Sequence, residues 1–181
     1  MFTGAKGKIL EFFFVEPEKR MHVKGLARAI GISAGSASRV CGELAAQGVL
    51  AREESANALF YSLNNSSALV KQWKRTWFLE KIELFKKNWE NEEFQSVALY
   101  GSYASGEFVS KSDVDFLVVT NVGHNKVFNS FKPLSDSLRP EVNPHPVSVG
   151  KWLKMAEERD RFYVEVLANH VLLYGAPLVV E

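Results

Sequence analysis

Residues 113–119, DVDFLVV, place two carboxylates at the start of an otherwise apolar run. The run is rich in the β-branched and aromatic side chains that are typical of a buried strand. Side chains alternate between the two faces of a strand, so Asp113 and Asp115 share one face while Val114 points to the other. Two neighbouring carboxylates repel each other, and a cation relieves that repulsion. The segment therefore predicts a strand that presents a metal site where it begins.

A Gly-Ser pair lies ahead of the aspartates and directly follows a second strand candidate, SVALY at 96–100. Glycine permits close approach of the backbone, and backbone amides together with the Ser102 hydroxyl can bind phosphate oxygens. Mg²⁺ takes oxygen ligands and is commonly held by one or two carboxylates plus substrate phosphates. We therefore expect Gly101 and Ser102 to hold phosphates beside a Mg²⁺ ion bound by Asp113 and Asp115.

The first third of the chain has the apolar period of short helices and ends in a hairpin. Helices are expected within 6–15, 22–33 and 33–50, and the hairpin within 49–63. Ser33 is a suitable N-cap for the third helix, and Gly48 is a suitable stop. This order of helices, turn and hairpin is that of a winged helix-turn-helix.

The third of these helices has one apolar and one polar face. Its inward stripe is expected to consist of Ala37, Val40, Leu44 and Ala45, with Cys41 as a small core residue. The polar residues expected to meet DNA phosphates and base edges, from this helix and its neighbours, are Lys24, Ser36, Ser38, Arg39 and Arg52.

Residues 66–91 contain neither glycine nor proline and are predicted to form one long helix. The spacing of Phe78, Ile82, Phe85 and Trp89 forms one apolar stripe, which Trp73, Trp77 and Leu84 widen. We expect this helix to join two domains and to offer a surface that pairs with its twin in a homodimer.

From residue 96 onward, strands alternate with helices. A helix is expected at 124–138, a strand at 141–149, a long amphipathic helix at 150–170 and a last strand at 171–175. Pro144 and Pro146 predict that the strand at 141–149 lies at a sheet edge with irregular pairing. The predicted fold class is α+β, with a winged helix-turn-helix domain at 1–65, a linker helix at 66–93 and a small mixed-sheet domain at 94–181.

Two stretches resemble known families. GISAGSASRVCGELAAQGVLAREESANALFYSLN, residues 31–64, resembles the MarR-like winged-helix family. GSYASG at 101–106 and SDVD at 112–115 resemble the minimal branch of the DNA polymerase beta-like nucleotidyltransferases. The second resemblance implies Mg²⁺-dependent transfer of a nucleoside monophosphate from an NTP, with ATP expected, to an acceptor hydroxyl. The implied metal ligands are Asp113 and Asp115, and the implied nucleotide contacts are Gly101, Ser102 and Ser112.

The chain departs from that family pattern at two positions. The family usually carries a third acid on a later strand, and here Asn143 occupies the expected position. Glu141, two residues earlier on the same face, is the candidate third catalytic carboxylate. Ser105 stands where many small members carry arginine, which removes one expected phosphate contact. A small family member of this kind can also modify a partner protein, which is a further candidate acceptor.

The bulk properties constrain the chain only loosely. A single cysteine among 181 residues fits a reducing cytoplasm, and no apolar run approaches the roughly 18 residues of a membrane span. Residues 1–65 carry eight Lys and Arg against six Asp and Glu, which is a weak footprint for double-stranded DNA. Two other interpretations therefore stay open: a DNA-binding regulator whose second domain only senses nucleotide, and an interaction scaffold with neither activity.

Overall fold

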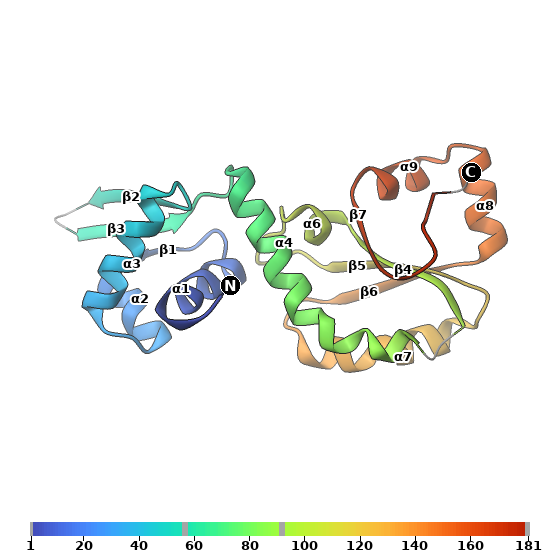
Figure 1. Cartoon of the computed structure of the whole chain (residues 1–181), viewed down its shortest axis with the longest axis horizontal. Coiled ribbons are helices and arrows are strands. Elements are labelled where there is room, and N and C mark those ends of the chain that lie inside the picture. The colour runs from blue at the N-terminus through green and yellow to red at the C-terminus, as the bar shows by residue number, and fades with distance from the viewer. Residues whose placement is uncertain (1, 56–57, 91–92, 180–181) are drawn as a thin grey trace. The chain divides into compact units, whose positions relative to one another are not determined.

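The computed structural model describes residues 2–55, 58–90 and 93–179. The chain divides into two compact units (Figure 1). The first contains residues 1–77 together with 108–110, and the second contains 78–107 and 111–181. The boundary at 77/78 falls inside the segment predicted as a linker helix.

The first unit has the predicted winged helix-turn-helix order. Its elements are α1 (Gly4–Val15), β1 (Arg20–His22), α2 (Val23–Ile30), α3 (Ala34–Ala46), β2 (Leu50–Ser55) and β3 (Ala58–Leu63). The three strands form an antiparallel sheet in the order β1-β3-β2, so β2 and β3 form the predicted hairpin. The short strand β1 was not predicted, because three residues are too few to carry a period.

The caps of α2 and α3 follow from single residues. Gly31 ends α2 with a left-handed φ of 65°, and Gly48 lies just beyond α3 with a φ of 70°. The Ser33 hydroxyl accepts a hydrogen bond from the Ser36 amide, which confirms Ser33 as the N-cap of α3. Cys41 is fully buried, as predicted, and burial raises the pKa of its thiol to about 11.

The predicted long helix is interrupted. It consists of α4 (Ala68–Ile82), a 3₁₀ turn η1 (Glu83–Phe85) and a short α5 (Lys87–Glu90). Leu84 was expected on the apolar stripe but is 78% exposed, so that prediction is wrong. The tighter turn changes the helical phase, and Trp89 beyond it is fully buried.

The second unit is built on a mixed sheet of β4 (Phe94–Tyr100), β5 (Val114–Thr120), β6 (Val142–Val147) and β7 (His170–Gly175). The strand order is β6-β5-β4-β7. Strand β6 runs parallel to β5, while β4 is antiparallel to both β5 and β7. The helices of this unit beyond β4 are α6 (Gly101–Ser105), α7 (His124–Ser137), α8 (Val149–Glu157) and α9 (Arg161–Ala168). The mixed sheet and the α+β class are therefore as predicted.

The prolines of β6 mark an edge strand, but they do not disturb its pairing. The register with β5 is regular from Val142 opposite Val114 to Val147 opposite Val119, so the expected irregularity is wrong. The carbonyl of Glu141 accepts a hydrogen bond from the Val114 amide and so faces β5. Because every second residue faces the same neighbour, Pro144 and Pro146 face the open edge, where no N–H is needed.

The sheet of the second unit has an apolar layer on each face, with α7 along one side and α9 along the other in Figure 1. On one face, the rings of Trp89, Phe116 and Phe131 pack against one another with centroid distances of 4.9 to 5.8 Å. The buried cluster on the other face consists of Ala98, Leu117, Val119, Val147, Trp152, Tyr163, Val166 and Leu178.

The predicted helix at 150–170 is two helices, α8 and α9. The chain turns at Arg159, which has a φ of 50°, and Asp160 caps α9 by accepting a hydrogen bond from the Phe162 amide. Within the described residues, no helix combines the length and the apolar character needed to cross a membrane.

We expect Phe131→Ala to lower the free energy of unfolding by about 3–5 kcal/mol, because it removes a ring that is 1% exposed from the aromatic stack. Phe128→Ala on the same helix is the matched control. Phe128 is 52% exposed, and its truncation should change stability by no more than about 0.5 kcal/mol. Urea unfolding followed by tryptophan fluorescence measures both, and equal losses would contradict this view of the core.

Candidate active site

The turn after β4 strongly favours glycine. Gly101 begins α6 with a φ of 70°, a conformation that costs other residues about 1–2 kcal/mol. A Cβ atom added there would lie 3.0 Å from Oδ2 of Asp115. The predicted phosphate-binding turn therefore lies directly against the second aspartate, at the same end of strands β4 and β5.

The two aspartates occupy the start of β5 as predicted. Asp113 is exposed just before the strand and Asp115 is half-buried within it, while Val114 between them is fully buried on the opposite face. Burial and the nearby charge of Asp113 raise the pKa of Asp115, although a hydrogen bond from Asn143 and the charge of His145 oppose this shift. The carboxylates are therefore close enough to repel each other.

The burial of Asp115 and its repulsion by Asp113 have a cost in folding. A raised pKa means that the folded chain holds the Asp115 proton more tightly than the unfolded chain does. The stability that this proton contributes is present at low pH and is lost as the pH rises through the folded-state pKa. A cation bound between the two groups would remove the repulsion, and the available donors are the hard oxygens that Mg²⁺ prefers. The residues therefore fit a Mg²⁺ ion.

Two uncharged tyrosine side chains lie near the two aspartates. Burial and the charge of Asp115 raise the pKa of Tyr100 to about 12. Burial and the charge of Asp113 likewise raise the pKa of Tyr103 to about 12. Tyr100 is the last residue of β4 and pairs with Asp115, and Tyr103 lies on α6 with its ring against Phe78. The sequence analysis assigned no role to either tyrosine, although Tyr103 lies within GSYASG, and the position of Tyr100 beside Asp115 depends on the register of the sheet.

Asn143 lies opposite Asp115 in the register of β5 and β6, at the position where the family resemblance implies a third acid. Glu141 immediately precedes β6, and its side chain is exposed. Among the described residues, no three His, Cys, Asp or Glu side chains gather into a metal-binding group, so Glu141 does not complete one with the two aspartates. Its catalytic role stays a prediction.

The serines of the motif have different surroundings. The Ser102 carbonyl accepts hydrogen bonds from the Glu107 amide and the Ser105 hydroxyl, at 2.9 and 3.1 Å. Ser105, which stands in place of the family arginine, thus closes the turn with its hydroxyl. Ser102 and Ser112 are both half-buried, and Ser112 directly precedes Asp113.

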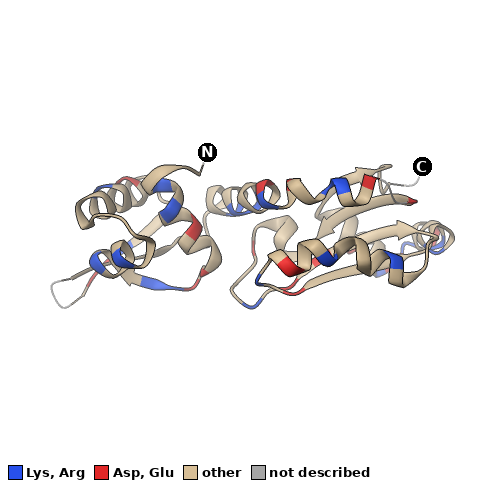
Figure 2. Cartoon of the chain, turned by 90° about the horizontal axis from the view of Figure 1, so that it is seen from below, with Lys and Arg blue, Asp and Glu red and all other residues tan. Residues whose placement is uncertain are grey.

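The predicted DNA contacts lie on three elements of the first unit. Lys24, Ser38, Arg39 and Arg52 are exposed on α2, α3 and β2. Ser36 is half-buried, and its hydroxyl accepts a hydrogen bond from the Ser33 hydroxyl within the cap of α3. Basic residues of this unit lie among acidic ones rather than in one unbroken stripe (Figure 2), as the 2.7 Å ion pair of Arg39 with Glu43 illustrates.

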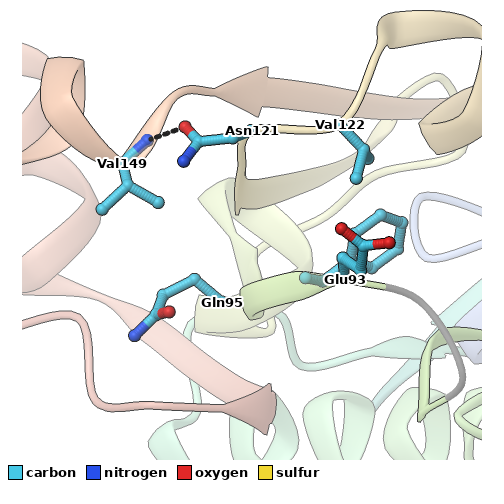
Figure 3. A pocket seen from close by; sticks show the side chains of 6 residues that line it. Glu93, Gln95, Asn121, Val122 and Val149 are labelled. Carbon is cyan, nitrogen blue, oxygen red and sulfur yellow. Dashed lines mark hydrogen bonds between the residues drawn. The ribbon is translucent and has the colours of Figure 1, made fainter.

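A pocket of about 390 Å³ lies elsewhere on the second unit (Figure 3). It is lined by Glu93, Phe94, Gln95, Asn121, Val122 and Val149. The Asn121 side chain accepts a hydrogen bond from the Val149 amide at 3.2 Å. Phe94 pairs with Thr120, whereas Tyr100 pairs with Asp115. The pocket is therefore at the opposite end of β4 and β5, roughly 20 Å from the aspartates at 3.3 Å per residue.

A mixed sheet with paired aspartates beside a glycine turn defines a candidate nucleotide-binding domain, which follows the winged helix in the sequence. The profile of the nucleotidyltransferase domain family matches residues 79–175, which is more than half of the chain. The chain belongs to this family. The profile of the MarR family, a family of DNA-binding domains, matches residues 9–58. No curated protein matches the chain.

Solved structures resemble the chain at low similarity. A toxin–antitoxin structure with AMP-PNP is 20% identical, covers 54% of this chain and 72% of its own, and has a TM-score of 0.36. A possible transcriptional regulator from Methanosarcina mazei Go1 is 18% identical over 49% and 80% of the two chains, with a TM-score of 0.34. A tri-AMPylated Shewanella oneidensis HEPN toxin in complex with MNT antitoxin is 19% identical over 59% and 73%, with a TM-score of 0.32. The family assignment rests on the nucleotidyltransferase profile.

We expect Gly101→Ala to destabilise the protein by about 1–2 kcal/mol, because alanine is strained at this φ and its Cβ would press on Asp115. Gly42→Ala in the interior of α3 is the control. A Cβ there meets no atom within 4 Å, and alanine should stabilise the helix by about 0.5–1 kcal/mol. Chemical denaturation distinguishes the two, and a neutral Gly101→Ala would contradict the close approach of the turn to Asp115.

Proposed function

We propose that this protein transfers a nucleoside monophosphate from an NTP, with ATP as the expected donor, to an acceptor hydroxyl in a Mg²⁺-dependent reaction. The observation that carries this proposal is the 3.0 Å separation between Asp115 Oδ2 and the Cβ position of Gly101. It brings the phosphate-binding turn and the carboxylate pair into one site. Membership of the nucleotidyltransferase domain family supports the reaction class.

In this proposal each group has a defined task. The backbone of the Gly101 turn and the Ser102 hydroxyl hold phosphate oxygens, with Ser112 beside them. Asp113 and Asp115 would hold Mg²⁺, and the bound ion would supply positive charge to neutralise the transferred phosphoryl group. Tyr100 and Tyr103 remain neutral and add no negative charge near the phosphates.

A base must remove the proton of the acceptor hydroxyl, and this chain has fewer candidates for that base than the family pattern implies. The Asn143 amide cannot take up a proton at neutral pH. Glu141, next to the start of β6, is the candidate base from the chain itself, since its backbone already pairs with that of Val114. A hydroxyl of a partner protein is one candidate acceptor, and a hydroxyl of a nucleic acid is another.

A second function is favoured by Asn143. Since Asn143 replaces the third acid, the domain could bind Mg²⁺ and nucleotide and transfer nothing, and the protein would be a DNA-binding regulator that senses nucleotide. In both cases the MarR-family domain binds double-stranded DNA, and we expect a homodimer because winged-helix proteins commonly read palindromic sites as dimers.

We expect ATP labelled at the α-phosphate, with Mg²⁺, to label an acceptor in a cell extract or to release pyrophosphate. Asp113→Asn and Asp115→Asn should lower the rate at least about 100-fold, because the metal contributes several kcal/mol of charge stabilisation. Asp136→Asn is the matched control, since Asp136 is an exposed residue of α7 that pairs with Lys132. Glu141→Gln tests the candidate base.

The outcomes separate the two functions. Labelling that is lost in both aspartate variants supports transfer, and labelling that survives in them overturns the assigned site. Binding of Mg²⁺-ATP without any product, measured by calorimetry, supports the nucleotide-sensing regulator instead. Failure of the wild-type protein to bind Mg²⁺-ATP would contradict both nucleotidyl transfer and nucleotide sensing by the second domain.

We expect Arg39→Ala to weaken binding to duplex DNA and to reduce the slope of log affinity against log salt by about 1, as for one lost phosphate contact. Arg161→Ala is the control, because Arg161 forms the same i,i+4 pair with a glutamate at 2.7 Å, but on α9 of the second unit. Gel shifts over a range of salt concentrations measure both variants. Equal effects would argue against α3 as the recognition helix.

A further inference from the structure

A buried lysine holds part of the segment between α6 and β5. Lys74 on α4 is 2% exposed, and its Nζ donates a hydrogen bond to the Phe108 carbonyl at 2.6 Å. The same Nζ lies 4.3 Å from the centre of the Phe108 ring. Burying a cation is costly unless it is well paired, and here a carbonyl oxygen and a ring face both meet it.

Two further contacts fix this segment. The Phe108 ring is buried and stacks on Trp77, with 6.3 Å between ring centres. The Glu18 carboxylate accepts hydrogen bonds from the Ser110 hydroxyl at 2.6 Å and the Ser110 amide at 3.2 Å. These two bonds, and more weakly the charge of Lys74, lower the pKa of Glu18. Residues 108–110 and all of these partners belong to the first unit.

The position of this segment in the sequence makes the contacts relevant to the site. Gly106, the last residue of the turn motif, is two residues before Phe108, and Asp113 is three residues after Ser110. Such short connections leave few backbone torsions between the anchored segment and each half of the site. Fixing residues 108–110 therefore restricts the backbone connection that joins the Gly101 turn to Asp113.

We propose that Lys74 and Glu18 are positioning residues for the nucleotide site, acting by holding segment 108–110. This inference rests on the proposed binding of Mg²⁺ and nucleotide. Neither residue needs to touch the nucleotide. Each reduces the ordering that the loop must undergo when phosphates bind, and less ordering means tighter binding.

The test is calorimetric titration of the full-length protein with Mg²⁺-ATP. Lys74→Met keeps a long apolar side chain and removes the charged donor, and Glu18→Ala removes the acceptor of both Ser110 bonds. We expect each variant to raise Kd roughly threefold to tenfold, from the usual cost of ordering side chains and loops on binding. Glu18→Gln keeps an acceptor oxygen and should restore wild-type affinity. Glu16→Ala is the control, because Glu16 pairs with Lys19 at 3.8 Å.

Hydrogen exchange gives a readout that does not depend on nucleotide. In Lys74→Met and Glu18→Ala, amides of residues 107–113 should exchange faster, while those in the middle of β5 should not change. Faster exchange together with wild-type affinity in both variants would overturn the positioning role. Unchanged exchange in Glu18→Ala would overturn the anchoring itself. A wild-type protein that does not bind Mg²⁺-ATP would instead overturn the proposed function, whatever the exchange data show.

Discussion

The repulsion between Asp113 and Asp115, beside a glycine turn that touches one of them, is the constraint on which the candidate site depends. The chain places a destabilising pair of carboxylates where the backbone of Gly101 approaches Asp115. Burial of Asp115 and the nearby charge of Asp113 both disfavour the ionised form of Asp115, and a bound cation would relieve the repulsion. Two neighbouring carboxylates beside a glycine turn are suited to binding a divalent ion together with an anionic ligand.

The fold around the site offsets the unfavourable interactions of the two aspartates. The mixed sheet has aromatic and aliphatic layers on both faces, and the aspartates stand at one end of a strand whose remaining residues are buried. Asn143 donates a hydrogen bond to Asp115, and such a bond favours the ionised form. Asn143 also stands where the resemblance implies a third carboxylate, and an amide cannot act as a base there.

Much of this arrangement could be predicted from local patterns. The spacing of GSYASG and SDVD, the strand alternation of DVDFLVV and the cap at Ser33 each depend on a few neighbouring residues, and each element was found as predicted. Two of the failures arose where the chain turns without glycine or proline. The turns at 83–86 and 158–160 interrupt predicted helices, and Leu84 is exposed although it continues an apolar pattern. Packing of Trp89 and capping by Asp160 decide these turns, and neither has a local signature strong enough to predict.

The sequence by itself determined most of the helices and strands, the shared face of the two aspartates and the preference for glycine at a tight turn, because strand alternation and backbone sterics act between near neighbours. Only the tertiary structure decided that Asp115 lies against Gly101 and opposite Asn143, that two tyrosines flank the pair, and that Lys74 and Glu18 hold residues 108–110. These relations join residues that are 10 to 92 positions apart. Strand register and side-chain burial set them, and both are properties of the packed chain.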